Sequence, residues 1–232
     1  MKAPIIEIFS SIQGEGLLIG KRQIFIRFAG CNLNCSYCDT EDSKKVGNTS
    51  LLTVDEVIEK IEKLYSDDLH SISLTGGEPS LYFEFINELI KKIDYKIMLE
   101  TNGTLYEHID KLNKIDYVSL DIKLPEHFDD DSFDDVFQNE IKSVNLLTSK
   151  AINVYCKLVV LPSTKINSIE NVIKKLSKEI LNKNDVQMVI QPSSPIEDWK
   201  DLSSNLFKFS EIIGKYFEVS TIPQIHKFLN IE

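Results

Sequence analysis

Short apolar runs alternate along the chain with segments in which apolar residues recur at helical spacing. The apolar runs predict strands at residues 24–28, 71–74, 96–100, 117–122, 152–161, 186–191 and 218–222. The segments between them predict helices at residues 53–64, 83–93, 105–112, 133–147, 168–181 and 202–216. Such an alternation is typical of a parallel sheet whose strands are buried under helices. The pattern therefore predicts an α/β fold with ligands bound at the carboxyl ends of the strands.

Polar residues mark the start of two of these helices. Thr53 and Glu56 have the spacing of a capping box in front of an apolar helical face. The acidic stretch from Asp129 to Asp135 precedes another helix. It lacks the glycine and the spaced ligands of a calcium loop. We therefore interpret it as a solvated helix entrance, where carboxylates face the positive end of the helix dipole.

Length and charge narrow the class of protein. The 232 residues suffice for one well-covered core and show no repeat or linker, so we expect a single domain, residues 1–232. A formal charge of −10 opposes binding to a phosphate backbone. No apolar run reaches the roughly 18 residues of a membrane span, and the N-terminus lacks the apolar core of a signal peptide. We expect a cytoplasmic protein with neither a nucleic-acid nor a membrane partner.

Three of the four cysteines lie in one loop, directly after the predicted strand 24–28. Cys31, Cys35 and Cys38 have the spacing Cys-x-x-x-Cys-x-x-Cys, which in a cytoplasmic chain indicates metal binding rather than disulfides. A ferredoxin holds a 4Fe–4S cluster with four cysteines, so three thiolates would leave one iron free. The alternative is a structural zinc site with Cys156 as fourth ligand. Cys156 lies within a predicted strand, where a buried free cysteine is ordinary packing.

The cysteine loop resembles that of the radical S-adenosylmethionine (radical SAM) superfamily, with Tyr37 as the aromatic residue before the last cysteine. The resemblance implies that the free iron binds the amine and carboxylate of S-adenosylmethionine. An electron from the cluster then cleaves the cofactor and releases a 5′-deoxyadenosyl radical, which abstracts hydrogen from a substrate. Tyr37 is expected to lie against the adenine.

Segments at the ends of four later strands resemble further superfamily motifs. They are Thr-Gly-Gly-Glu-Pro at 75–79, Glu-Thr-Asn-Gly-Thr at 100–104, Ser-Leu-Asp-Ile-Lys at 119–123 and Gln-Pro-Ser-Ser at 191–194. The second could also be an Asn-Gly turn and the fourth a plain loop. The residues that the resemblance assigns to cofactor binding are Tyr37, Cys38, Asp39, Gly77, Glu100, Asn102, Ser119, Asp121, Lys123, Gln191, Pro192, Ser193 and Ser194.

The N-terminal part resembles one family of that superfamily, the 7-carboxy-7-deazaguanine synthases. The resemblance is carried by residues 7–16 (Glu-Ile-Phe-Ser-Ser-Ile-Gln-Gly-Glu-Gly), 27–31 (Arg-Phe-Ala-Gly-Cys) and 38–40 (Cys-Asp-Thr), and it extends to 223–227. It implies conversion of 6-carboxy-5,6,7,8-tetrahydropterin to 7-carboxy-7-deazaguanine with loss of ammonia, on the route to queuosine and other deazapurines. It also implies a single-domain abbreviated (partial) TIM-like β/α barrel with parallel strands, a homodimer, and a flavodoxin- or ferredoxin-type reductant.

The resemblance assigns substrate binding to Ile12, Gln13, Gly14, Glu15, Arg27, Thr75 and His226. Arg27 can hold the substrate carboxylate as a bidentate fork, and Gln13 can pair with donors or acceptors of the pterin edge. The glycines beside Glu15 are expected to let backbone amides reach the ring. The family match alone assigns Thr40 to Mg²⁺, since this ion otherwise prefers carboxylates and water. A surface position for Arg27 and for His226 stays open.

Two other functions remain as alternatives. A glycyl-radical enzyme activase shares the cysteine spacing and a segment like 121–123, but it has no need of Gln13 to Gly16 beside Arg27. An iron–sulfur electron-transfer protein or a zinc-binding module would not cleave S-adenosylmethionine at all.

Overall fold

The computed structural model describes residues 1–47 and 49–231, and Asn48 and Glu232 lie outside the described residues. The strands are β1 (Lys2–Ile12), β2 (Arg22–Phe28), β3 (Ser50–Thr53), β4 (Ser71–Gly76), β5 (Ile97–Thr101), β6 (Tyr117–Asp121), β7 (Asn153–Val160), β8 (Gln187–Pro192) and β9 (Glu218–Thr221). The α-helices are α1 (Val54–Leu64), α2 (Phe83–Ile90), α3 (Tyr106–Asp110), α4 (Phe133–Ser149), α5 (Ile166–Glu179), α6 (Ser203–Ile213) and α7 (Ile225–Leu229).

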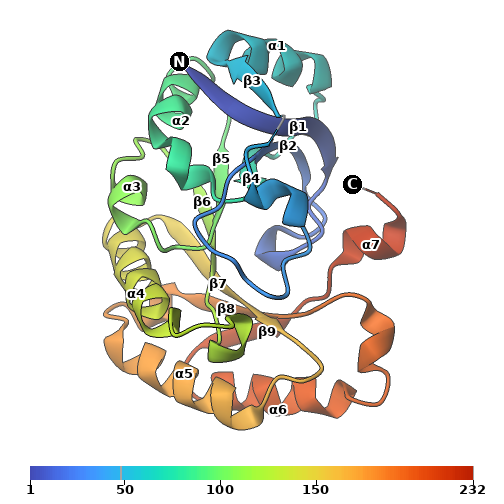
Figure 1. Ribbon diagram of the computed structural model, residues 1–232, viewed down its shortest axis with the longest axis vertical. Coiled ribbons are helices and arrows are strands. Elements are labelled where there is room, and N and C mark those ends of the chain that lie inside the picture. Colours follow the sequence, from blue (N-terminus) through green and yellow to red (C-terminus); the bar gives the residue numbers. More distant parts are fainter. Residues whose placement is uncertain (48, 232) are drawn as a thin grey trace.

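The strands form one sheet that does not close, in the order β3-β1-β2-β4-β5-β6-β7-β8-β9. The neighbours from β2 to β9 pair in parallel. Helices α1 to α6 lie along the outside of this curved sheet, and α7 lies apart from them on the side where the loops gather (Figure 1). The prediction of an abbreviated barrel with parallel strands is therefore confirmed for this part of the sheet.

Two strands extend the sheet beyond the predicted pattern. β1 pairs with β2 and with β3, and both pairings are antiparallel. The sequence pattern predicted neither strand, and at this end the sheet is antiparallel. Because β1 is antiparallel to β2, its last residue, Ile12, pairs with Arg22 at the start of β2. The loop after β1 then reaches β7, where Glu15 pairs with Lys157.

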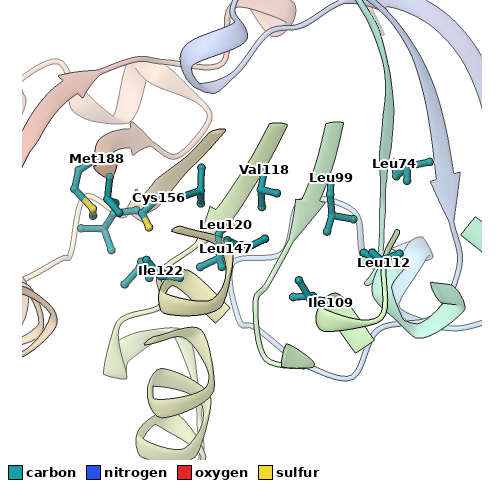
Figure 2. Close-up of a cluster of buried hydrophobic side chains, with 14 of the residues drawn as sticks. Leu74, Leu99, Ile109, Leu112, Val118, Leu120, Ile122, Leu147, Cys156 and Met188 are labelled. Atoms are coloured by element: carbon teal, nitrogen blue, oxygen red, sulfur yellow. The ribbon is translucent and has the colours of Figure 1, made fainter. Parts of the chain in front are cut away.

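The parallel strands alternate strictly between a helix-facing and an inner side chain, since successive strand residues point to opposite faces. Leu74, Leu99, Val118, Leu120 and Cys156 all lie in the core shared with the helices, beside Ile109, Leu112 and Leu147 (Figure 2). The residues between them face the concave side of the sheet. Cys156 is fully buried on the helix side, as expected of ordinary packing.

Away from the pocket, the concave side carries both polar and apolar residues: Gln23 donates to Ser71 at 2.8 Å and lies 3.3 Å from the Met98 sulfur. Met98, Tyr155 and Val189 form a small apolar cluster, against which Leu17 and Leu18 pack from the loop after β1. This cluster fills the interior below the carboxyl ends of the strands. The polar residues that follow on the same face are thereby left to line a pocket at the strand ends.

The N-termini of α1 and α4 have the features that the sequence predicted. Thr53 and Glu56 form the predicted capping box, in which the Thr53 Oγ1 accepts from the Glu56 backbone N–H and the Glu56 carboxylate accepts from the Thr53 N–H. Asp129 to Asp131 are exposed before α4, and Asp134 and Asp135 lie in its first turn. The interpretation as a solvated helix entrance is confirmed. None of the helices among residues 1–47 and 49–231 has the length and apolar character to cross a bilayer.

Candidate functional site

The main pocket opens at the carboxyl ends of the parallel strands, and most of the residues chosen from the sequence line it. They are Ile12, Gln13, Gly14, Glu15, Arg27, Cys31, Cys35, Tyr37, Cys38, Asp39, Thr40, Thr75, Gly77, Glu100, Asn102, Asp121, Lys123 and His226. These residues come from widely separated segments of the chain. The parallel order explains why, because it brings the loops after β2, β4, β5 and β6 to one edge of the sheet.

The cysteine loop is fixed by backbone hydrogen bonds at both ends. The Gly30 N–H donates to the Ser43 carbonyl at 2.7 Å, and the Ser36 N–H donates to the His127 carbonyl at 3.0 Å. The β4 end lies directly against the start of this loop. Gly76 has a φ of +123°, and a Cβ on Gly77 would collide with the Gly30 carbonyl. Glycines at 76 and 77 are therefore needed for this close approach.

The three loop cysteines fit an iron–sulfur cluster. Cys31, Cys35 and Cys38 all line the pocket, and burial raises the pKa of the Cys31 and Cys35 thiols. Bound iron would compensate for this, because metal ligation requires the thiolates. In residues 1–47 and 49–231 no three His, Cys, Asp or Glu side chains are grouped as ligands of one ion. A cuboidal cluster does not require such a group, since each thiolate binds a different iron.

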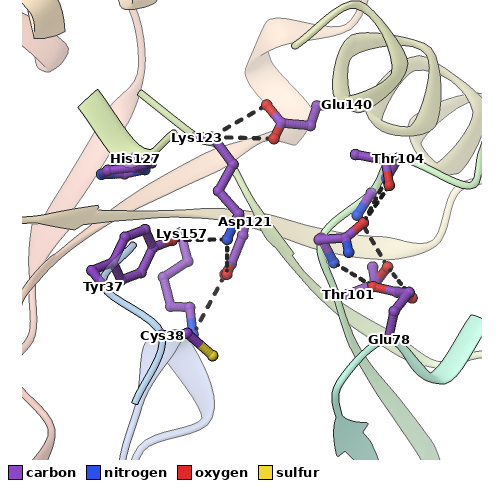
Figure 3. A network of polar contacts seen from close by, with 12 residues as sticks. Tyr37, Cys38, Glu78, Thr101, Thr104, Asp121, Lys123, His127, Glu140 and Lys157 are labelled. Atoms are coloured by element: carbon purple, nitrogen blue, oxygen red, sulfur yellow. Dashed lines mark hydrogen bonds and ion pairs between the residues drawn. The ribbon is translucent and has the colours of Figure 1, made fainter. Parts of the chain in front are cut away.

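The aromatic residue of the loop is held by a buried lysine. Lys123 Nζ donates to the Tyr37 hydroxyl and to Asp121 Oδ2, both at 2.8 Å (Figure 3). The Tyr37 ring also contacts the buried His127 ring, with 4.3 Å between centroids. On the other side of Lys123, its backbone N–H donates to the carboxylate of Glu140 on α4. Tyr37 is thus positioned from both the sheet and the turn after it.

A second buried lysine, Lys157, was not chosen from the sequence. It lies on the inner face of β7, between a 2.7 Å ion pair with Glu15 and a 3.5 Å ion pair with Asp121. Burial alone would lower the pKa of Lys157, but the carboxylates of Asp121 and Glu15 outweigh burial and raise it well above its usual value. Burial likewise opposes ionisation of Glu15 and Asp121, yet the lysines lower the pKa of both acids. All of these groups stay charged.

The carboxylate of the Gly-Gly-Glu-Pro motif faces inward to support the next strand. Glu78 is fully buried and accepts from the Thr101 hydroxyl and the Asn102 N–H, both at 2.8 Å. Asn102 in turn donates to the Asn32 side chain at 2.9 Å and lies 3.9 Å from the Cys31 sulfur. The motif therefore connects the end of β5 to the cysteine loop.

The Gln13 side chain is fully occupied by neighbouring protein groups. Its amide nitrogen donates to Glu100 at 2.8 Å and to Gln23 at 2.9 Å, and its oxygen accepts from the Glu15 N–H at 3.0 Å. Glu100 also accepts from Ser73 and Thr75. With both ends of the amide bonded, Gln13 orients Glu100 and the loop before Glu15.

The two glycines beside Glu15 permit close packing rather than leaving space. A Cβ on Gly14 would collide with the His226 ring, and a Cβ on Gly16 would collide with the Tyr155 ring. Gly16 also has a positive φ of +61°. His226 therefore closes one side of the pocket from α7, against the loop after β1.

Arg27 is oriented by the strand beside it. Its Nε donates to Glu7 Oε1 at 2.6 Å, and its guanidinium lies 5.6 Å from the centre of the Phe9 ring. Phe9 stacks on Phe25, with 5.1 Å between ring centroids. Among the described residues the Glu7 bond uses Nε alone, so both Nη groups remain available as a bidentate donor edge.

Five predicted cofactor residues do not line the main pocket. Ser119 is buried on the inner face of β6, and the others form the segment 191–194 after β8. Pro192 and Ser194 line a neighbouring cavity beside α7, together with Gln224 and Lys227. Sequence reasoning missed Lys157, Gln224, Phe9 and Phe25. Alternation along the predicted strand 152–161 could have placed Lys157 inward, since its neighbour Cys156 is apolar and faces the helices.

Comparisons with known proteins agree with this site. The model of the radical SAM superfamily matches residues 25–202. A 7-carboxy-7-deazaguanine synthase of Methanothermobacter thermautotrophicus is 45% identical over all of this chain and 98% of its own length. One from Methanocaldococcus jannaschii is 36% identical over 97% of this chain and 98% of its own.

Solved structures share the fold. QueE from Escherichia coli superposes with a TM-score of 0.64 at 19% identity, covering 95% of this chain and 94% of QueE. TYW1 with a bound lysine–pyruvate adduct gives a TM-score of 0.56 at 14% identity, over 84% of this chain and 74% of TYW1. The open β/α sheet and the three-cysteine loop define a radical SAM protein, a class that uses a 4Fe–4S cluster and S-adenosylmethionine. Within it, the chain belongs to the family of 7-carboxy-7-deazaguanine synthases.

The two kinds of cysteine give a first prediction. Replacing Cys35 with Ala should abolish both iron binding and cleavage of S-adenosylmethionine, because one cluster ligand is lost. Cys156→Ala is the matched control, since Cys156 is buried on the helix side of β7. It should keep about four irons per chain after anaerobic reconstitution, as a three-cysteine 4Fe–4S site requires. Loss of iron from Cys156→Ala would contradict the three-cysteine assignment.

Proposed function

We propose that this protein is a radical SAM lyase, a single catalytic domain over residues 1–232, which converts 6-carboxy-5,6,7,8-tetrahydropterin to 7-carboxy-7-deazaguanine and ammonia. The observation that carries the proposal is the full-length similarity to named synthases, joined to a pocket that combines the cysteine loop with Arg27. The cluster and S-adenosylmethionine supply a 5′-deoxyadenosyl radical that takes a hydrogen atom from the substrate. The protein's own residues bind and orient the pterin.

The ring and the carboxylate of the substrate have distinct partners in this proposal. The Nη edge of Arg27 takes the carboxylate as a bidentate pair, because Glu7 already fixes the guanidinium through Nε. The Gly14 N–H and the Glu15 carbonyl take the edge of the ring, while Thr75 and His226 border it. The Glu15 N–H and the Gly14 carbonyl are already bonded to Gln13 and Ile225. The side chains of Gln13 and Glu15 act indirectly, since every nitrogen and oxygen atom of both already has a protein partner.

Cofactor contacts are proposed for the groups around the cysteine loop. Tyr37 would lie against the adenine, the Gly77 carbonyl would accept from the methionine amine, and the polar residues at the ends of β5 and β6 would bind the ribose and carboxylate. Ser119 and residues 191–194 do not line the main pocket, and we assign them an indirect contribution to cofactor binding. Thr40, whose hydroxyl lies 3.8 Å from the Cys38 sulfur, would hold a Mg²⁺ ion, which would supply positive charge for the substrate carboxylate.

Further partners follow from the family. We propose that the protein is a homodimer, that a flavodoxin- or ferredoxin-type protein reduces the cluster, and that the enzyme works in the cytoplasm, where thiols stay reduced. The product would enter queuosine or another deazapurine route. The relatives named as synthases match over the whole chain. This supports the synthase over a glycyl-radical activase, an electron-transfer protein or a zinc-binding module.

The decisive experiment is an anaerobic assay of the reconstituted, reduced protein with the carboxytetrahydropterin and S-adenosylmethionine. Mass spectrometry should detect a product lighter than the substrate by one molecule of ammonia. A protein that cleaves S-adenosylmethionine but leaves the pterin unchanged would refute the synthase assignment and leave the radical chemistry intact. A radical that appears only on an added partner protein would instead favour the activase.

Arg27→Lys tests the carboxylate clamp. Lysine keeps the charge but loses the planar fork and the Nε bond to Glu7. One lost charge-assisted hydrogen bond costs about 1.5–3 kcal/mol, or roughly ten- to two-hundredfold in an equilibrium constant. Formation of the deazaguanine should fall by this factor, while slow uncoupled cleavage of S-adenosylmethionine continues because the cysteine loop is unchanged. Equal loss of both activities would argue against a substrate role for Arg27.

Thr40→Ala tests the magnesium site. The wild type should turn over faster as Mg²⁺ is added, and the variant should respond less while keeping its iron, since the cysteines are untouched. Iron content and turnover across a Mg²⁺ titration check this. The same Mg²⁺ dependence in both proteins would remove Thr40 from the site.

A further inference from the structure

The side chain of Gln224 connects three separate segments at the rim of the pocket. Its amide nitrogen donates to Glu15 Oε1 at 2.6 Å and to Asp39 Oδ2 at 3.0 Å. Its amide oxygen accepts from the Ser194 hydroxyl at 2.6 Å. Gln224 is only 5% exposed, so every polar atom of its side chain is both buried and bonded.

The two carboxylates that Gln224 bridges belong to loops with different tasks. Glu15 lies in the loop after β1, which borders the proposed pterin site. Asp39 lies between Cys38 and Thr40, at the end of the cysteine loop. Both side chains line the main pocket. The amide is therefore a direct physical link between the substrate loop and the cluster loop.

The charges of Glu15 and Asp39 explain why the side chain between them, Gln224, is a neutral amide. Each carboxylate also has its own cation: Lys157 contacts the other oxygen of Glu15 at 2.7 Å, and Lys227 contacts the same Oδ2 of Asp39 at 3.3 Å. The two carboxylates repel each other, because both carry negative charge and both lie within hydrogen-bond distance of the same amide nitrogen. One amide nitrogen carries two hydrogens and can satisfy both acids at once. A third acid here would add repulsion, and an apolar residue would leave Glu15 Oε1 without its hydrogen-bond donor and Asp39 with Lys227 alone.

The backbone beside Gln224 reinforces the link. The Ile225 N–H donates to the Gly14 carbonyl at 3.0 Å, and the His226 ring occupies the space where a side chain on Gly14 would lie. The segment that leads into α7 thus packs on the substrate loop while its glutamine holds the cluster loop.

We propose that Gln224 is a positioning residue, which sets the distance between the bound pterin and the radical source by joining Glu15 to Asp39. The inference rests on the proposed function and deepens it. Hydrogen abstraction depends on close placement of the reacting atoms, and an error of 1 Å can cost about a hundredfold in rate. Loss of the link should therefore uncouple the two half-sites: S-adenosylmethionine is still cleaved, but fewer radicals reach the pterin.

The test compares Gln224→Met with wild type and with Gln138→Met. Methionine keeps the length of the side chain and removes its hydrogen bonds. Gln138 donates to Glu179 at 3.4 Å between α4 and α5, away from the pocket, and so provides a matched loss of an amide–carboxylate bond. The readout is 5′-deoxyadenosine formed per deazaguanine, normalised to iron content. This ratio should rise at least about tenfold in Gln224→Met, because its hydrogen bonds to two carboxylates are lost, and stay at the wild-type value in Gln138→Met.

Two more variants should give graded ratios of 5′-deoxyadenosine to deazaguanine. Gln224→Asn keeps the amide on a shorter stem that reaches only one carboxylate, so its ratio should be intermediate. Gln224→Glu should be the most uncoupled, because it places a third carboxylate between two others. A wild-type ratio in Gln224→Met or in Gln224→Glu would overturn the proposal.

Hydrogen exchange gives a readout that does not depend on turnover. In the reconstituted protein, backbone amides at 13–16 and 36–40 should exchange faster in Gln224→Met than in wild type, and at the wild-type rate in Gln138→Met. Unchanged exchange in Gln224→Met would refute the link itself. If wild type makes no deazaguanine, the proposed reaction fails, whereas the exchange result still decides whether Gln224 holds the two loops.

Discussion

A carboxylate that leaves bulk water keeps its charge only if cations or hydrogen-bond donors replace its hydration. Several carboxylates lie at the carboxyl ends of the parallel strands, and their hydrogen-bond and ion-pair partners come from other segments of the chain. Asp121 needs Lys123 and Lys157, Glu15 needs Lys157 and Gln224, and Glu100 needs Gln13. Satisfying these acids fixes the loops around the pocket relative to each other. The shape of the site is therefore a result of charge compensation as much as of apolar packing.

Because side chains alternate between the two faces of a strand, neighbouring residues have different roles. On β7, Cys156 packs among aliphatic side chains under the helices, while Lys157 reaches the pocket and joins two acids. On β6, Leu120 and Asp121 are divided in the same way. One face of the sheet can thus be selected for close packing and the other for chemistry. Shifting any of these strands by a single residue would exchange the two faces.

The sequence was sufficient for the parts of the structure that are encoded locally. Apolar runs located the seven parallel strands, and contiguous motifs located the cysteine loop and the glycines at 76 and 77. β1 and β3 were missed because they form an antiparallel extension outside the repeated strand–helix units. Lys157 and Gln224 were missed because their partner Glu15 lies 142 and 209 residues away, respectively. Such pairs follow from the completed fold, which no local pattern contains.

The bond between Glu15 and Gln224 also has a consequence for biosynthesis. Residues 13–40 leave the ribosome long before residue 224 has been translated, and at about 5–20 residues per second this interval lasts roughly ten seconds or more. During that time the nascent cysteine loop has no contact with the segment that later covers it. The thiols are then accessible to an iron–sulfur carrier on a chain that cannot yet enclose a substrate. Translation order thus allows metal delivery to precede closure of the pocket.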